Sequence, residues 1–194
     1  MALQLQKVEA GQRINLSKEH AGLKRVRIGL SWDVKEGVTA DLDASVLVLG
    51  SNEKMLTEES IVFYNQTELY SGAVKHSGDE RTGDTRGDDE SIVIDLSKLP
   101  ADAKILMAVI TIYGAGQGTP VTFGRVKNAS VRLYDADKNE ALYEYDLTED
   151  ASRATAVEMA RLYIKDGAWR YTSLGETVGT SQNGLVDIIN RYQR

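Results

Sequence analysis

The sequence predicts a mainly β protein: an antiparallel β-sandwich with one or two short C-terminal helices packed on it. Three observations favour this class. Apolar and polar residues alternate along much of the chain, as they do in strands with one buried face. Turn-rich stretches, rather than helical segments, join most of the apolar segments. Amphipathic helical spacing is confined to the last quarter of the chain.

The first strands are read from alternation and from apolar runs. In residues 23–32, the inward positions Val26, Ile28 and Leu30 alternate with charged or small residues, which predicts a half-buried strand. Residues 41–50 are apolar at odd and even positions after Ala44, which predicts a central strand covered on both faces. The most buried strand is expected at 104–113, and further strands are expected at 61–65, 91–96 and 120–126.

Residues 129–147 predict a hairpin, because two alternating segments flank the turn-rich stretch DADKN at 135–139. This stretch also resembles the start of an EF-hand loop. Glu140, however, stands where that loop requires glycine, so a hairpin turn is the better interpretation.

The C-terminal quarter predicts a helix from Asp150 or Ser152 to about Lys165, ended by Gly167. One apolar stripe at helical spacing supports it, formed by Ala156, Met159, Ala160 and Tyr163. Residues 168–175 return to strand character, and 182–192 predict a second short helix.

Length and composition bound the possible functions. The chain has 194 residues, which suits a single domain over 1–194. It has no cysteine, which excludes thiol catalysis, disulfides and thiolate metal sites. No secretory signal and no apolar run of membrane-spanning length are present, so a cytoplasmic protein is expected. The sequence has no basic stripe interleaved with aromatic residues, which argues against nucleic acid as a partner.

The acidity is concentrated in one loop. Residues 76–90 read HSGDERTGDTRGDDE and contain six acids and two arginines, a charge of −4 out of a total of −6. Such a loop is either a solvated surface segment or a metal site in which a cation cancels the repulsion. The residues alone leave both interpretations open.

Two acidic clusters would supply the ligands of a metal site. Asp41 and Asp43 lie two apart at the start of a strand, so their side chains share one face. The second cluster belongs to the acidic loop and consists of Asp79, Asp84, Asp88, Asp89 and Glu90. Irregular oxygen-rich sites of this kind suit Ca²⁺, whereas two histidines and no cysteine suit zinc and copper poorly.

Several motifs, in this order, resemble the TerD family of tellurium-resistance and general stress proteins. They are DLDASVLVLG, IVFYNQ, HSGDERTGDTRGDDESIVIDL, FGRVKNASVRLYD and YDLTEDASRATAVEMARLY. The resemblance runs nearly end to end. It implies a calcium-binding β-sandwich of the cytoplasm, encoded in bacterial stress operons.

The resemblance also implies a ligand set. Its members are Asp41 and Asp43 of DLD, Asn65 of FYN, Asp79, Asp84 (where the family often has Glu), and Asp88, Asp89 and Glu90 of GDDE. Arg86 stands where an Asp is usual in the family. A cation in the place of a ligand predicts one tightly bound Ca²⁺, with a second ion bound weakly or not at all.

The function expected from these features is non-enzymatic: calcium orders the 76–90 loop, and the ordered surface binds protein partners, with other stress-operon products as the expected class. The alternatives are a metal-dependent enzyme and a calcium-dependent peripheral membrane module. His76, Ser77 and Asp79 include the residue types of a catalytic triad, but triad members converge from separate segments. No apolar residue lies between Ser77 and Ser91, which disfavours membrane insertion.

Overall fold

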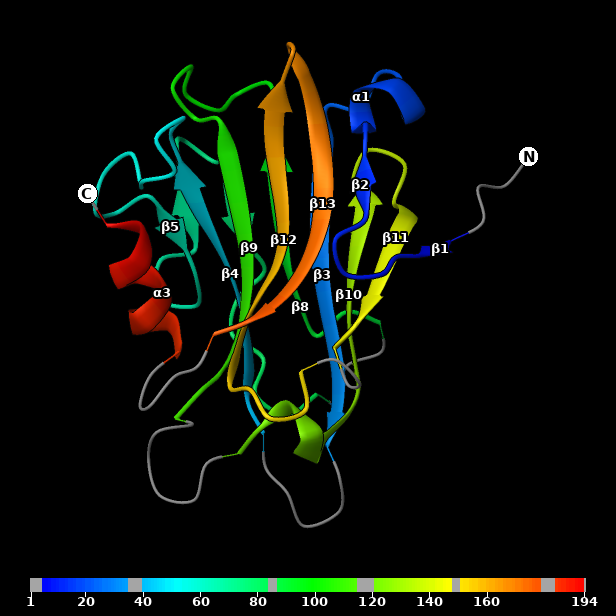
Figure 1. The fold of residues 1–194 in the computed structure, drawn as a ribbon, viewed down its shortest axis with the longest axis vertical. Coiled ribbons are helices and arrows are strands. Elements are labelled where there is room, and N and C mark those ends of the chain that lie inside the picture. Colours follow the sequence, from blue (N-terminus) through cyan, green and yellow to red (C-terminus); the bar gives the residue numbers. More distant parts are fainter. Residues whose placement is uncertain are drawn as a thin grey trace.

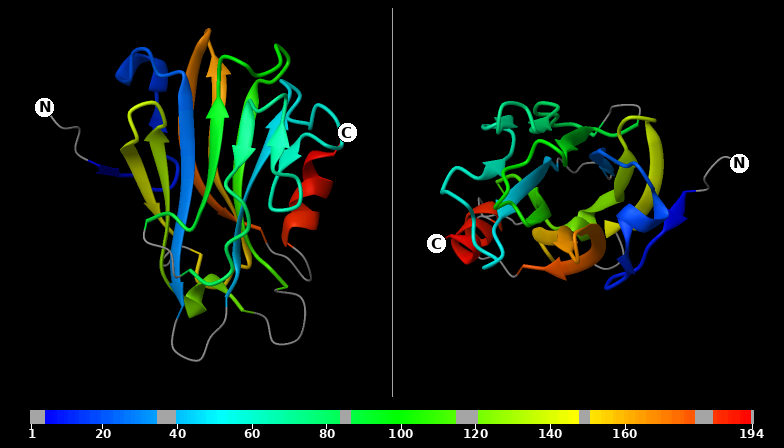
Figure 2. Two further views of the ribbon diagram at one scale, coloured as in Figure 1. Left: turned by 180° about the vertical axis from the view of Figure 1, so that it is seen from behind. Right: turned by 90° about the horizontal axis from the view of Figure 1, so that it is seen from above.

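The computed structural model describes residues 5–34, 40–83, 87–114, 121–147, 151–178 and 184–193. Two sheets pack face to face, which confirms the predicted sandwich (Figure 1, Figure 2). The pairings between their strands are antiparallel, apart from a short parallel contact between β1 and β11.

The strands and helices have the following bounds. The seven-stranded sheet has the order β1 (Gln6–Lys7), β11 (Glu140–Asp146), β10 (Val126–Asp135), β3 (Arg25–Val34), β8 (Glu90–Asp95), β7 (Val74–His76), β6 (Glu68–Leu69). The six-stranded sheet has the order β2 (Arg13–Ile14), β13 (Ala168–Thr177), β12 (Ala156–Lys165), β9 (Ile105–Ile112), β4 (Leu42–Leu49), β5 (Ile61–Val62). The helical elements are α1 (Leu16–Glu19), the 3₁₀ turn η1 (Phe123–Arg125) and α3 (Gly184–Tyr192).

The main core lies between the two sheets. Val26, Ile28 and Leu30 of β3 are buried there, as their alternation predicts. All eight residues of β4 and all eight of β9 are buried, because these central strands are covered on both faces. The predictions of covered strands at 41–50 and 104–113 are therefore confirmed.

A second apolar cluster covers the outer face of the six-stranded sheet. Leu47, Met107 and Val109 belong to it on the sheet, and Leu185 and Ile188 of α3 pack against them. The C-terminal helix expected at 182–192 thus forms over Gly184–Tyr192 and packs at the β4–β5 side of this sheet, as Figure 1 shows. No helix within the described ranges combines the length and apolar character needed to cross a bilayer.

The helix predicted from Asp150 or Ser152 to Lys165 is wrong: Ala156–Lys165 is strand β12. It lies between β9 and β13, and all of its residues from Ala156 to Ala160 are buried, so apolar residues occupy odd and even positions there. A register shift between Glu158 and Ala160 also breaks the period of two. Together these features imitate helical spacing, although Val157, Tyr163 and Ile164 are typical strand residues.

Two shorter predictions also need correction, and one is confirmed. The strand expected at 61–65 is limited to Ile61–Val62. Of the segment expected at 120–126, residues 121–126 are described; Phe123–Arg125 form the turn η1, and strand β10 begins at Val126. The predicted hairpin is present, with Asp135 opposite Glu140 across its turn.

One end of the sandwich, at the bottom of Figure 1, gathers the strand ends that bear the acidic residues. The antiparallel register places the start of β4 beside the end of β9, with Leu42 opposite Ile112. It also places the start of β8 beside β3, with Glu90 opposite Leu30. The two predicted acidic clusters therefore enter the fold at the same end.

Candidate metal centre

Three carboxylates from two separate segments meet at this end. Asp41 and Asp43 come from the start of β4, and Asp79 follows β7. One oxygen from each lies within 4.8 Å of the others. Two oxygens that bind one Ca²⁺ at about 2.4 Å each can be up to about 4.8 Å apart. The three side chains are thus close enough to share one ion.

The surroundings of these carboxylates leave their charge poorly compensated. Asp43 is only 3% exposed. The Oδ1 atom of Asp41 is buried and has no hydrogen-bond partner in the described part of the chain. The cation in contact is Arg81, whose Nε donates to Asp79 Oδ2 at 2.9 Å from an exposed side chain. A buried oxygen without a donor is the kind of atom that a cation would satisfy.

Burial and mutual repulsion raise the pKa of Asp41 and of Asp43. Desolvation raises the pKa of Asp43 to about 8, with further increases from Glu90, Asp41 and Asp79. Desolvation also raises the pKa of Asp41 to about 6, helped by Asp79 and Glu90. Without a cation, therefore, both groups retain their protons above the usual range for a carboxyl.

The protein without calcium should lose stability as the pH rises. The folded state holds protons on Asp41 and Asp43 more tightly than the unfolded chain, whose carboxyls titrate near 3.8. The contribution of these protons is complete below about pH 4 and is lost as the pH passes about 6 and then about 8. Thermal melting in chelator across this range measures it. The variant Asp43→Asn should show a weaker pH dependence, and an equal dependence in both proteins would contradict the assignment.

Glu90 lies next to the three carboxylates but is occupied by backbone donors. Its side chain is fully buried; Oε2 accepts from Ala44 N at 2.8 Å, and Oε1 accepts from Glu80 N at 3.3 Å. It therefore connects the residue after Asp43 with the residue after Asp79. We interpret Glu90 as a brace between the two segments that carry the ligands.

His76 completes this brace, a role for which no sequence pattern singles it out. Its Nδ1 accepts from Gly78 N at 3.0 Å, so Nε2 bears the ring proton. Nε2 lies 3.2 Å from Ala44 O and 3.4 Å from Glu90 Oε2. Side chains of the seven-stranded sheet thus satisfy both backbone polar groups of Ala44 in β4.

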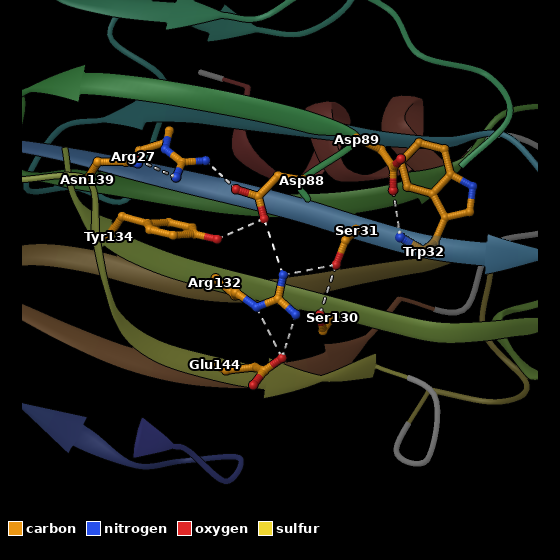
Figure 3. A network of polar contacts seen from close by, with 10 residues as sticks. All are labelled: Arg27, Ser31, Trp32, Asp88, Asp89, Ser130, Arg132, Tyr134, Asn139 and Glu144. Atoms are coloured by element: carbon orange, nitrogen blue, oxygen red, sulfur yellow. Dashed lines mark hydrogen bonds and ion pairs between the residues drawn. The ribbon is translucent and has the colours of Figure 1, made fainter. Parts of the chain in front are cut away.

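Asp88 and Asp89, two of the other expected ligands, do not belong to this group of three carboxylates. Asp88 binds Arg27, Arg132 and Tyr134 on the outer face of the seven-stranded sheet, and Asp89 Oδ2 accepts from Trp32 N at 2.9 Å (Figure 3). Asn65 is exposed in the turn after β5. Asp84 and Arg86 lie outside the described residues.

Two tyrosines flank the three carboxylates. The pKa of Tyr64 is raised by desolvation and by Asp43, Tyr113, Asp79 and Asp41. Its ring meets that of Tyr113 edge to face, with centroids 5.8 Å apart. Tyr113 is 58% exposed, which is unusual for so large a ring. The sequence signal for this pair is that Tyr64 lies two residues after the end of β5 and Tyr113 directly after the end of β9.

The donor set suits a hard cation. Carboxylate oxygens are the ligands that Ca²⁺ and Mg²⁺ prefer, and the protein has no thiolate to offer. Of its two histidines, His76 is held as described, and His20 Nε2 contacts Tyr143 Oη at 2.8 Å. The residues present therefore fit calcium, and Asp41, Asp43 and Asp79 are the described residues that would hold it.

Comparison with known proteins places this arrangement in context. A family model described as "TerD domain" matches residues 1–192. General stress protein 16U of Bacillus subtilis is 40% identical over 185 residues, covering 94% of each chain. The tellurium resistance protein TerD of an Alcaligenes species is 40% identical over 184 residues, also covering 94% of each chain. A solved structure of a TerD homologue from Streptomyces coelicolor shares the fold, with a TM-score of 0.68 over 82% of this chain and 92% of that one, at 22% identity.

Proposed function

The chain belongs to the TerD family, and on that premise we propose that it is a calcium-binding module of a bacterial stress response. Calcium holds the segment of Asp79 against the start of β4, and the surface ordered in this way binds a protein partner. The relatives' names, tellurium resistance protein and general stress protein, support the stress-response setting. We place this activity in the cytoplasm, as the family resemblance implies.

One observation carries the proposal. Three carboxylates share a space suited to one ion, and one of their oxygens is buried with no hydrogen-bond partner among the described residues. A plain solvated acidic loop would place its charges in water, where repulsion is weak. Here Asp43 is buried beside other acids, an arrangement that costs free energy unless a cation or protons neutralise it. A calcium ion would supply that neutralisation and would bind the unpartnered oxygen.

The same geometry favours binding over catalysis. A general base needs a free lone pair within reach of a substrate. His76 Nδ1 already accepts a hydrogen bond from Gly78 N, and the His76 side chain is fully buried. The exposed groups beside the acids are Arg81 and Tyr113, which suit contact with a partner surface. We therefore propose a non-enzymatic role for this end of the sandwich.

Calcium should bind more tightly than magnesium, by about 100-fold or more. Calcium accepts six to eight oxygens in irregular geometry, whereas magnesium requires a near-ideal octahedron and gives up its water reluctantly. Parallel titrations of chelator-stripped protein with the two chlorides, followed by tyrosine absorbance, test this selectivity. Tyr64 and Tyr113 beside the acids provide the signal. Equal midpoints for the two ions would contradict the ligand assignment.

A further inference from the structure

We propose that Asp88 is a positioning residue for the candidate calcium site rather than one of its ligands. In this proposal its ion pairs with Arg27 and Arg132, on the outer face of the seven-stranded sheet, fix the start of β8. That strand end in turn holds the segment of Asp79 against Asp43. The inference rests on the calcium-binding function proposed above and adds to it a residue that acts from outside the site.

The contacts of Asp88 use both of its carboxylate oxygens (Figure 3). Oδ1 accepts from Tyr134 Oη at 2.9 Å and from Arg132 Nη1 at 3.4 Å, while Oδ2 pairs with Arg27. The Asp88 side chain is only 5% exposed. The two arginines supply the positive charge that an ion would otherwise supply, so this carboxylate is already neutralised.

The partners of Asp88 are themselves fixed. The guanidinium of Arg27 lies over the Tyr134 ring, 3.7 Å from its centroid. The guanidinium of Arg132 also donates to Glu144 at 2.9 Å. Asp88 is thus attached directly to β3 and β10, and Arg132 connects it to Glu144 of β11.

Gly29 of β3 makes this attachment possible. The Asp88 carboxylate lies directly against its backbone, and a Cβ at this position would collide with the carboxylate carbon and both oxygens. Gly29 lies opposite Ser91 in the register between β3 and β8. The side chain that is absent from Gly29 therefore leaves the space in which Asp88 is held.

A continuous series of contacts runs from Asp88 to the three carboxylates. The next residue, Asp89, donates from its backbone N to Leu30 O at 2.8 Å, which sets the register of β8 on β3. Glu90, opposite Leu30, then crosses to the other sheet and accepts from Ala44 N. Its second oxygen accepts from Glu80 N, beside Asp79. A displacement of Asp88 would thus be transmitted to the segment that carries Asp79.

Amide hydrogen exchange on the chelator-stripped protein tests the structural part. In Asp88→Asn and in Gly29→Ala, exchange at the Asp89 and Glu80 amides should become about 10-fold faster or more, because the start of β8 opens more often. Asp137→Asn is the matched control, since Asp137 pairs with Arg25 on the same face at 2.6 Å. It should leave both amides unchanged. If Gly29→Ala does not fold, Arg27→Gln tests the same contact.

Calcium affinity separates a positioning residue from a ligand. We expect Asp88→Asn and Gly29→Ala each to weaken calcium binding about 10-fold. Calcium affinity in the double variant should equal that of the more affected single variant, because both substitutions break the same contact between Asp88 and Gly29. A large loss in Asp88→Asn with no loss in Gly29→Ala would show that Asp88 is a ligand and would overturn the inference.

The remaining outcomes are also decisive. Lower melting temperatures with unchanged exchange and unchanged affinity would mean that Asp88 only stabilises the fold, and the inference would fail. If the unmutated protein binds no calcium, the proposed function fails. In that case exchange alone decides whether Asp88 positions the segment of Asp79.

Discussion

Excess calcium should raise the melting temperature of the chelator-stripped protein by about 5–10 °C. A ligand at 100 times its dissociation constant stabilises the folded state by about 2.7 kcal/mol. In a domain of this size, each kcal/mol shifts the melting temperature by about 2–4 °C. The gain should increase with pH between about 6 and 9, because calcium then displaces fewer protons from Asp41 and Asp43.

Magnesium at the same concentration is the control for general ionic effects, and potassium chloride at equal ionic strength is the control for screening. The increase should be specific to calcium. An unchanged melting curve on adding and then chelating calcium would favour the solvated-loop interpretation of residues 76–90.

The variant Asp43→Asn should have opposite effects on the two forms of the protein. Without calcium it removes a buried carboxylate that lies beside Asp41 and Glu90, so the fold should gain about 1–3 kcal/mol at pH 8. In calcium the same change removes charge from the site, so affinity should fall about 100-fold or more. Few substitutions both stabilise the calcium-free protein and abolish its stabilisation by calcium. The two opposite effects together would therefore identify Asp43 as a ligand.

Asp137→Asn is the control here as well. Asp137 is 44% exposed and pairs with Arg25, so the amide costs little in either form. Melting curves of both variants, recorded with chelator and with calcium, measure the four values needed. Equal losses of calcium stabilisation at the two positions would contradict the placement of the site at Asp43.

Much of the sandwich could be predicted because alternation reports one-sided burial directly. Val26, Ile28 and Leu30 face the core as their spacing requires, and the hairpin at DADKN forms. The segment 156–165 could not be predicted in the same way, since its first half is buried at odd and even positions and a register shift follows Glu158, so it has no period of two. Knowledge of its neighbours β9 and β13 is needed to interpret it.

In the candidate site, too, some features follow from local sequence and others depend on residues distant in sequence. Asp41 and Asp43 share one face of an extended chain, so their proximity follows from local geometry. In GDDE, three consecutive acids have different surroundings: Asp88 meets two arginines, Asp89 meets the backbone of Trp32, and Glu90 crosses to Ala44. These partners are distant in sequence, so composition alone could not separate ligands from positioning residues.

Calorimetric titration of the chelator-stripped protein with calcium chloride tests the central claim most directly. The proposed site predicts at least one ion per chain, bound with a heat that is lost in Asp43→Asn and kept in Asp137→Asn. If Arg86 replaces a ligand of a second ion, one tight ion is expected, and Arg86→Asp should strengthen a second. No measurable heat in the unmutated protein at millimolar calcium, or equal heats in both Asp→Asn variants, would contradict the account.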